Sequence, residues 1–246
     1  MAYRLVLIRH GNSTWNSLNR FTGWADVDLS DQGETEARNA GKLLLENGFI
    51  FDQGYTSVLK RAIRTFQLSM ESSHMTWLSV TKCWRLNERH YGGLQGKNKN
   101  DAVEDYGADE VQSWRRAYDT KPPLLSEFDP RHPSREERYR DISPEELPIG
   151  ESLKDTLDRV LPYWEHELKP AIKSGKRLII AAHGNSLRAL AKNLENLSNE
   201  EVLNLEIPTG KPLVYELDEQ DLHVIKKYYL TSKKDQSSSW FSFFKR

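Results

Sequence analysis

The tetrapeptide His-Gly-Asn-Ser occurs twice, at residues 10–13 and 183–186, and each copy follows an apolar run. Runs of this kind, within residues 3–9 and 177–182, are typical of buried strands, and Asn and Ser can cap a following helix. Two parallel strands would bring His10 and His183 to the same sheet edge, where ligands bind in open α/β folds. Because a neutral imidazole can attack phosphorus, we interpret His10 as a phosphoryl carrier.

Arginines near the same edge could hold the phosphoryl group. Arg9 precedes His10, and Arg61 lies near the start of a predicted helix that follows a short strand. An arginine fork binds phosphate bidentately, and each charge-assisted hydrogen bond contributes about 1.5–3 kcal/mol. Arg115 and Arg116 are a further candidate pair, although a helix does not easily aim adjacent side chains at one point.

Glu88 is a candidate general acid or base in an irregular polar loop at residues 84–97. A carboxyl group beside a bound anion has a raised pKa and can exchange a proton with the substrate. Metal binding by His10 and His183 is an alternative. It usually needs a third ligand, and the sequence carries no HExxH-type signature.

The composition limits the possible functions. The chain of 246 residues is 29% charged and 37% hydrophobic with a net charge of −1, so extensive nucleic-acid binding is not expected. Cys83 is the only cysteine, which excludes an internal disulfide and cysteine-based zinc sites and suits a reducing cytosol. No apolar run reaches about 18 residues and no signal peptide is visible, so we expect a cytoplasmic protein that does not enter a membrane.

The order of the elements predicts an α/β fold with three layers, in which helices cover both faces of a mostly parallel central sheet. Strands are expected at residues 3–9, 54–57, 77–80, 177–182, 213–217 and 223–229. Helices are expected at residues 14–20, 33–47, 58–71, 98–106, 108–119, 151–172 and 183–194, and Pro162 should kink or divide the helix at 151–172.

The elements are expected to form one catalytic domain over residues 1–230. Residues 121–150 contain six of the ten prolines, which indicates a long insertion over the core rather than a linker. Residues 231–246 are rich in Ser and Lys and are expected to form a flexible tail.

Several motifs together resemble those of the cofactor-dependent phosphoglycerate mutases, a family of the histidine phosphatase superfamily. The similarity runs in order from about residue 3 to residue 230, and its RHG element alone marks only the superfamily. Two blocks are far more specific, namely TSVLKRA at 56–62 and LNERHYG at 86–92. Further matching segments are WN at 15–16, RFTGW at 20–24, WRR at 114–116, AAHGNSLR at 181–188 and IPTG at 207–210.

The resemblance implies a role for each matching residue. His10 would be the phosphorylated histidine, surrounded by Arg9, Arg61 and His183, and Glu88 would exchange a proton with the substrate hydroxyl. The remaining substrate contacts would come from Ser13, Asn16, Thr22, Gly23, Tyr91, Lys99, Arg115, Arg116, Gly184 and Asn185.

The resemblance also implies an activity. The family interconverts 3-phosphoglycerate and 2-phosphoglycerate in glycolysis and gluconeogenesis, uses 2,3-bisphosphoglycerate as the priming phosphoryl donor, and needs no metal. Its members are homodimers or homotetramers, and the expected partners are small phosphorylated three-carbon acids. A histidine phosphatase, a bisphosphoglycerate synthase of the same fold and a catalytically inactive binding protein are the alternatives.

Some positions depart from the family pattern, and others refine the function that it implies. Asn12 stands where the family usually has Glu, which keeps hydrogen bonds but loses a charge, and Gly93 replaces a common Ala. Ser13, Thr22 and Gly23 favour a mutase over a synthase. The tail carries aromatic residues at 240, 241, 243 and 244, which either fray with the terminus or dock on the body or a partner.

Overall fold

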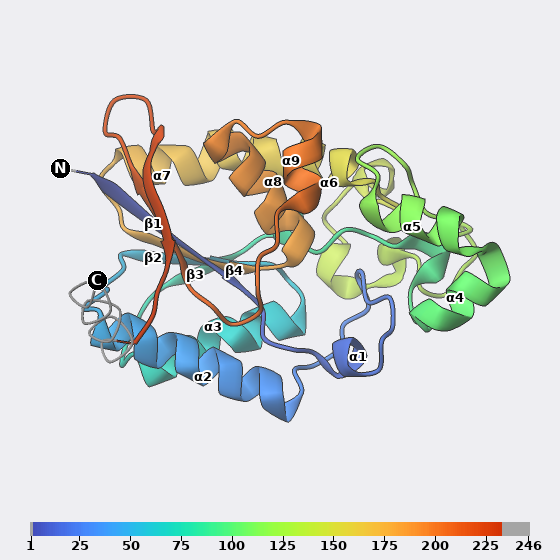
Figure 1. The fold of residues 1–246 in the computed structure, drawn as a ribbon, viewed down its shortest axis with the longest axis horizontal. Helices are drawn as coiled ribbons and strands as arrows, with labels where there is room; N and C mark the ends of the chain where they lie inside the picture. Colours follow the sequence, from blue (N-terminus) through green and yellow to red (C-terminus); the bar gives the residue numbers. More distant parts are fainter. Residues whose placement is uncertain (1, 233–246) are drawn as a thin grey trace, which may run out of the picture.

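A six-stranded sheet lies at the centre of the computed structural model, which describes residues 2–232 (Figure 1). The strand order is β3-β2-β4-β1-β5-β6. The strands are β1 (Tyr3–Arg9), β2 (Gln53–Thr56), β3 (Val80–Lys82), β4 (Leu178–Ala182), β5 (Leu213–Leu217) and β6 (Val224–Tyr229). Neighbours from β3 to β1 are parallel, and β5 pairs antiparallel with both β1 and β6. The predicted mostly parallel sheet is confirmed, and its third strand lies later in the chain than expected.

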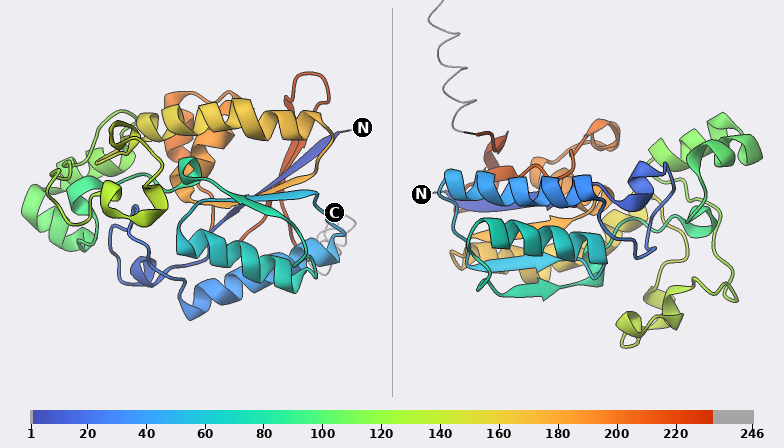
Figure 2. Two further views of the ribbon diagram at one scale, coloured as in Figure 1. Left: turned by 180° about the vertical axis from the view of Figure 1, so that it is seen from behind. Right: turned by 90° about the horizontal axis from the view of Figure 1, so that it is seen from below.

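Helices cover both faces of this sheet, as Figures 1 and 2 show. One face carries α2 (Asp31–Glu46) and α3 (Lys60–Ser72). The other face carries α6 (Leu153–Tyr163), α7 (Lys169–Lys173) and α8 (Gly184–Glu195), with α9 (Asn199–Asn204) packed beside α8. The predicted three-layer arrangement is therefore confirmed.

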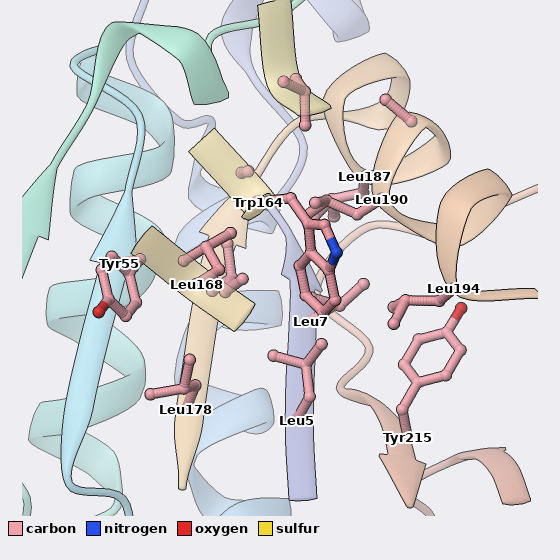
Figure 3. Close-up of a cluster of buried hydrophobic side chains, with 14 of the residues drawn as sticks. Leu5, Leu7, Tyr55, Trp164, Leu168, Leu178, Leu187, Leu190, Leu194 and Tyr215 are labelled. Atoms are coloured by element: carbon pink, nitrogen blue, oxygen red, sulfur yellow. The ribbon is translucent and has the colours of Figure 1, made fainter. Parts of the chain in front are cut away.

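The side chains of β1 alternate between the two helical layers. Leu5 and Leu7 belong to the core cluster beneath α6 and α8, which Figure 3 shows around Trp164. Val6 and Ile8 belong to the opposite cluster beneath α2 and α3. All four residues are fully buried, and burying a side chain of this size stabilises the fold by about 1.5–3 kcal/mol. Burial on both faces explains why this strand appears in the sequence as a continuous apolar run.

Pro162 changes the helix predicted for residues 151–172. The structure begins α6 at a capping box formed by Ser152 and Asp155 and then passes through a π-helical turn, Trp164–Leu168, before α7. Proline cannot donate the usual backbone hydrogen bond, so the regular α-helical ladder is interrupted near it. The helical path continues through a wider turn and does not break at Pro162.

Residues 92–150 lie beyond one end of the sheet, away from the amino terminus (Figure 1). They form α4 (Lys99–Tyr106), α5 (Ala108–Arg116) and four short 3₁₀ turns. The helix expected at 108–119 therefore ends earlier. Likewise α1 (Thr14–Ser17) is shorter than the helix expected at 14–20. Phe21 joins an apolar cluster with residues of α4 and α5, so residues 92–150 pack against the loop that contains Phe21.

Two glycines set the path of the chain after β1. A β-carbon on Gly11 would lie 2.2 Å from the carbonyl oxygen of Gly33, and one on Gly33 would lie 1.9 Å from the carbonyl oxygen of Asn12. Gly11 also donates its N–H to Thr65 Oγ1 at 3.0 Å. The loop that follows His10 is therefore held directly against the start of α2 and against α3.

None of the helices within residues 2–232 combines the length and the apolar composition needed to cross a bilayer. Residues 233–246, including the aromatic residues expected either to fray or to dock, lie outside the described part of the chain.

Candidate active site

The pairing of β1 with β4 brings the two histidines together. Arg9 is the register partner of Ala182, and the His10 N–H donates to the Ala182 carbonyl oxygen at 2.9 Å. The rings of His10 and His183 are 5.0 Å apart between centroids. Both side chains are buried. The repeated tetrapeptide thus forms one site at the carboxyl edge of the parallel strands.

Hydrogen bonds fix which nitrogen of His10 can act as a nucleophile. Nδ1 lies 2.7 Å from the Gly11 carbonyl oxygen, which can only accept a hydrogen bond, so Nδ1 carries the proton. Nε2 therefore presents its lone pair, and Arg61 Nε donates to it at 3.3 Å. Arg61 is itself held by the carbonyl oxygens of Gly23 and Ala25.

Burial keeps both rings neutral. Burial, reinforced by the charges of Arg61 and Arg9, holds the pKa of His10 well below its usual value. Burial and the charge of Arg61 also lower the pKa of His183. A neutral imidazole is the form that can attack phosphorus, so the arginines that would bind a phosphoryl group also keep the nucleophile unprotonated.

Ser57 orients His183, a contact that the sequence analysis did not predict. The Ser57 hydroxyl lies 2.7 Å from His183 Nε2. His183 Nδ1 is buried and has no hydrogen-bond partner among residues 2–232. Ser57 lies inside the TSVLKRA block, so this block supplies a residue to each side of the histidine pair: Arg61 to His10 and Ser57 to His183.

Glu88 faces the two histidines from the loop at 84–97. Its Oε1 accepts hydrogen bonds from the Arg89 N–H at 2.8 Å and from the backbone and side chain of Asn185 at 3.1 and 2.8 Å. Burial raises the pKa of Glu88, but these hydrogen bonds and the charge of Arg61 outweigh it and leave the pKa below its usual value. The expected rise in pKa thus depends on a neighbouring anion, since the protein groups act in the opposite direction.

A cavity of about 130 Å³ lies against His10 and is strongly cationic. Its lining includes five cationic side chains, from Arg9, Arg20, Arg61, Lys99 and Arg115, and a single carboxylate, that of Glu88. The complete lining is Arg9, His10, Asn16, Arg20, Phe21, Thr22, Gly23, Arg61, Glu88, Tyr91, Lys99 and Arg115.

Unpaired polar atoms also mark this place. Arg9 Nε and Thr22 Oγ1 are buried without a hydrogen-bond partner in the part of the chain that the structure describes. Burying such groups without a partner is costly. The cavity is therefore suited to a compact, multiply charged anion.

A second cavity of about 400 Å³ adjoins the first and shares Arg9, Tyr91 and Arg115 with it. Arg116 and Arg188 line the second of these two cavities and not the first. The resemblance gives Arg115 and Arg116 as substrate contacts, and the structure places them differently: Arg115 lines both cavities, and Arg116 lines the second. Neighbouring residues of a helix point about 100° apart, so Arg115 reaches the cavity beside His10 and Arg116 faces the adjoining cavity.

The remaining predicted residues lie around these cavities in different ways. Ser13 is the buried N-cap of α1 and bonds Asn16, so it orders that side chain and does not line the cavity itself. Gly184 begins α8, and a β-carbon there would lie 3.5 Å from Arg9 Nε. Asn185 binds Glu88.

Arg20, Phe21 and Arg188 also line the cavities, although they were not predicted as site residues. Each lies within a segment that resembles the family, directly beside or shortly after a predicted residue, and this adjacency was the available signal. Asn12 does not line either cavity. Its side-chain oxygen accepts hydrogen bonds from Ser17 and Ser30 and so links α1 to the N-cap of α2.

The metal alternative can be tested against the same geometry. Ligand atoms of His10, Glu88 and His183 all lie within 4.8 Å of one another, which would suit a divalent cation. However, the positively charged guanidinium of Arg61 lies 3.3 Å from the His10 Nε2 that a metal would need, and it would repel a cation there. Arg9 adds a second positive charge close enough to lower the pKa of both histidines. These charges favour an anion at this place.

Comparisons with known proteins agree with this fold. Residues 5–129 and 124–229 match the family model described as histidine phosphatase superfamily, branch 1. A mycobacterial glucosyl-3-phosphoglycerate phosphatase, solved in complex with VO3, is 23% identical with a TM-score of 0.68, and the match covers 94% of this chain and 98% of that chain. An alpha-ribazole phosphatase from Shigella flexneri is 20% identical with a TM-score of 0.66, covering 93% and 96% of the two chains. At these identities the likeness to both structures concerns the fold.

Proposed function

This chain belongs to branch 1 of the histidine phosphatase superfamily, whose members are phosphoryl-transfer and phosphatase enzymes, and we propose that it is a mutase that interconverts 3-phosphoglycerate and 2-phosphoglycerate through a phosphohistidine on His10. The observation that carries this proposal is the second group of cations in the cavity beside His10. Arg9 and Arg61 flank the nucleophile, whereas Lys99 and Arg115 reach the same cavity from α4 and α5.

A mutase and a phosphatase make different demands on this second group. A phosphatase needs one phosphate pocket and a path for water. A mutase must hold a doubly phosphorylated intermediate while that molecule turns around, so it needs anion binding at both ends. Burial lowers the pKa of Lys99, and the charges of Arg115 and Arg9 add to this effect. Such crowding of positive charge favours an anion between these cations.

The residues suggest a simple sequence of steps. His10 Nε2 would attack phosphorus, forming a P–N bond while the P–O bond of the donor breaks. Arg9 and Arg61 would stabilise the negative charge on the oxygens in transfer. Glu88 would give a proton to the departing oxygen and take one from the hydroxyl that next attacks the phosphohistidine. In this proposal His10 is primed from 2,3-bisphosphoglycerate, whose two phosphates match the two groups of cations.

Hydrolysis is the second candidate function. The two structural neighbours described above are phosphatases by their titles. Hydrolysis would use the same phosphohistidine and would differ only in the final acceptor, which is water in place of a substrate hydroxyl. A bisphosphoglycerate synthase would use the same residues and release the doubly phosphorylated molecule.

One experiment separates these activities. The protein is incubated with 3-phosphoglycerate, with and without 2,3-bisphosphoglycerate, and 2-phosphoglycerate and inorganic phosphate are measured in the same sample. We expect 2-phosphoglycerate to form only after priming, faster than phosphate is released, together with acid-labile phosphate on His10.

The His10→Asn variant is the control for this experiment. It should lower turnover by more than about 10⁴-fold, as expected when a covalent nucleophile is removed. Phosphate release without 2-phosphoglycerate would overturn the mutase proposal in favour of hydrolysis. A protein with neither turnover nor phosphohistidine would support the binding-protein alternative.

A further inference from the structure

A buried ion pair lies behind the loop that carries Glu88. Arg159 of α6 and Glu151, which precedes the N-cap of α6, are 7% and 3% exposed. Arg159 Nε lies 2.6 Å from Glu151 Oε1, and Nη2 lies 3.0 Å from Oε2. Neither residue lines the cavity beside His10.

The other hydrogen bonds of this pair converge on one short segment. Arg159 donates to the carbonyl oxygens of Arg85, Asn87 and Glu88 at 2.6, 3.0 and 2.8 Å. Glu151 accepts the His90 N–H at 2.7 Å through Oε2 and donates its own N–H to the His90 carbonyl oxygen at 2.8 Å. The pair therefore holds the backbone on both sides of Glu88.

We propose that Glu151 and Arg159 are positioning residues that hold Glu88 at the distance and angle needed for proton transfer at His10. Stability alone does not explain the pair, because apolar residues of similar volume often stabilise a core as well as a buried ion pair does. Arg159, in contrast, supplies directional bonds to three carbonyl groups that a hydrophobic side chain cannot replace. This inference rests on the proposed role of Glu88 as the acid and base.

The choice of substrate gives a test that separates positioning from simple folding. Phosphoglycerate releases an alkoxide and so requires a proton from the acid, whereas p-nitrophenyl phosphate releases a stable phenolate and requires little help. A misplaced Glu88 should therefore slow the phosphorylation of His10 by the first substrate much more than by the second. A general loss of structure would slow both.

We would compare kcat and KM of Glu151→Gln and Arg159→Lys with those of the wild type on both substrates. We expect kcat for phosphoglycerate to fall by about 100-fold, as for a catalytic group displaced by about 1 Å. KM for phosphoglycerate should stay near the wild-type value. The ratio kcat/KM for p-nitrophenyl phosphate should also stay near the wild-type value, because it depends on the phosphorylation of His10 and not on the later attack of water that Glu88 also assists. Circular dichroism and the thermal midpoint show whether each variant is folded.

Arg177→Lys is the matched control. Arg177 forms a similar two-bond pair with Asp52, at 2.8 Å for both bonds, but this pair is exposed and is not bonded to the Glu88 loop. The control should leave kcat on both substrates unchanged.

Chemical rescue of the Arg159→Ala variant gives a second readout of the positioning role. Arg159 and Glu151 line a separate cavity of about 430 Å³ on the outer side of the loop, which gives a small cation access to the pair. Added ethylguanidinium should therefore restore part of the lost kcat for phosphoglycerate in Arg159→Ala.

The result that would overturn the inference is an equal loss of kcat for phosphoglycerate and of kcat/KM for p-nitrophenyl phosphate, or no loss of either in folded Glu151→Gln. The failure of the mutase proposal would show differently. In that case the wild type would form no 2-phosphoglycerate, and the same comparison would be made on phosphate released from 3-phosphoglycerate.

Discussion

Arg115 is the residue at which a mutase and a phosphatase are expected to differ most. It lines the cavity beside His10, yet it comes from α5, outside the central sheet. In the proposed mechanism, His10, Arg9 and Arg61 receive and hold the transferred phosphoryl group. Arg115 would then bind a second anionic group of the substrate.

Arg115→Gln should therefore raise KM for 3-phosphoglycerate while leaving KM for p-nitrophenyl phosphate close to that of the wild type. Loss of one charge-assisted hydrogen bond costs about 1.5–3 kcal/mol, which corresponds to a KM increase of about 10- to 150-fold. Steady-state kinetics on the two substrates measure this difference. An equal change on both would mean that Arg115 supports the fold and not the second anionic group.

Asn12 departs from the family pattern, and neighbouring residues accommodate this change. The carboxylate usual at this position would add a negative charge next to Glu36, whose carboxylate accepts the Asn12 N–H at 2.8 Å. The amide instead accepts hydrogen bonds from Ser17 and Ser30. Since Asn12 lines neither cavity beside the histidines, its effect on the site acts through the position of the loop that follows His10.

At the scale of elements, the contact between α2 and the loop that follows His10 determines where His10 lies. Gly33→Ala would place a methyl group 1.9 Å from the Asn12 carbonyl oxygen, so backbone must move. We expect a loss in the free energy of unfolding of at least about 1–3 kcal/mol, together with a lower kcat because the His10 loop shifts. Urea denaturation and steady-state kinetics measure the two effects.

Gly93→Ala is the comparison for this change. A β-carbon at Gly93 would lie 3.5 Å from its nearest neighbour, an ordinary contact, and the backbone there does not have a positive φ angle. This substitution should leave activity unchanged and raise stability by up to about 0.4–1 kcal/mol, because alanine restricts the unfolded chain. Equal stability losses in the two variants would contradict the steric argument.

The features of the fold and of the site that could be predicted from the sequence have local causes. The apolar runs before the two histidines identify β1 and β4, and the parallel pairing of these strands then places both histidines at one edge. Strand β3 was placed too early because all three of its residues are exposed, so no burial pattern marks it. Its position comes from its pairing with β2.

Features that depend on the packing of distant segments could not be predicted. A helical pattern shows that Arg115 and Arg116 point in different directions, but not which of them faces His10. Likewise Arg159 binds carbonyl groups more than 70 residues earlier in the chain, and backbone carbonyls leave no signal in the residue types. The Ser57–His183 bond spans 126 residues and was missed for the same reason.

At the scale of the whole molecule, buried histidines link stability to pH. Burial lowers the pKa of His10 and His183 well below the usual value, and it lowers the pKa of His90 to about 3. Below pH 6.5 the unfolded chain binds protons at these rings while the folded protein does not. Acid therefore favours the unfolded state, by up to about 1.4 kcal/mol per pH unit for each ring.

We expect the free energy of unfolding to be nearly constant above pH 7 and to fall between pH 6.5 and pH 5, as measured by urea denaturation. This window lies above the range in which most carboxyl groups titrate. The exposed His223 acts in the opposite direction, because its bond to Asp221 raises its pKa.

The His90→Gln variant tests the contribution of one ring. The Gly92 N–H donates to His90 Nδ1, and the glutamine side chain keeps an acceptor for this N–H. The substitution removes one of three similar contributions to the pH dependence. The slope in this variant should fall by about one third. A flat dependence in the wild type would show that these rings take up protons in the folded protein and would remove the basis for a neutral His10 at the site. An unchanged slope in His90→Gln would show the same of His90 alone.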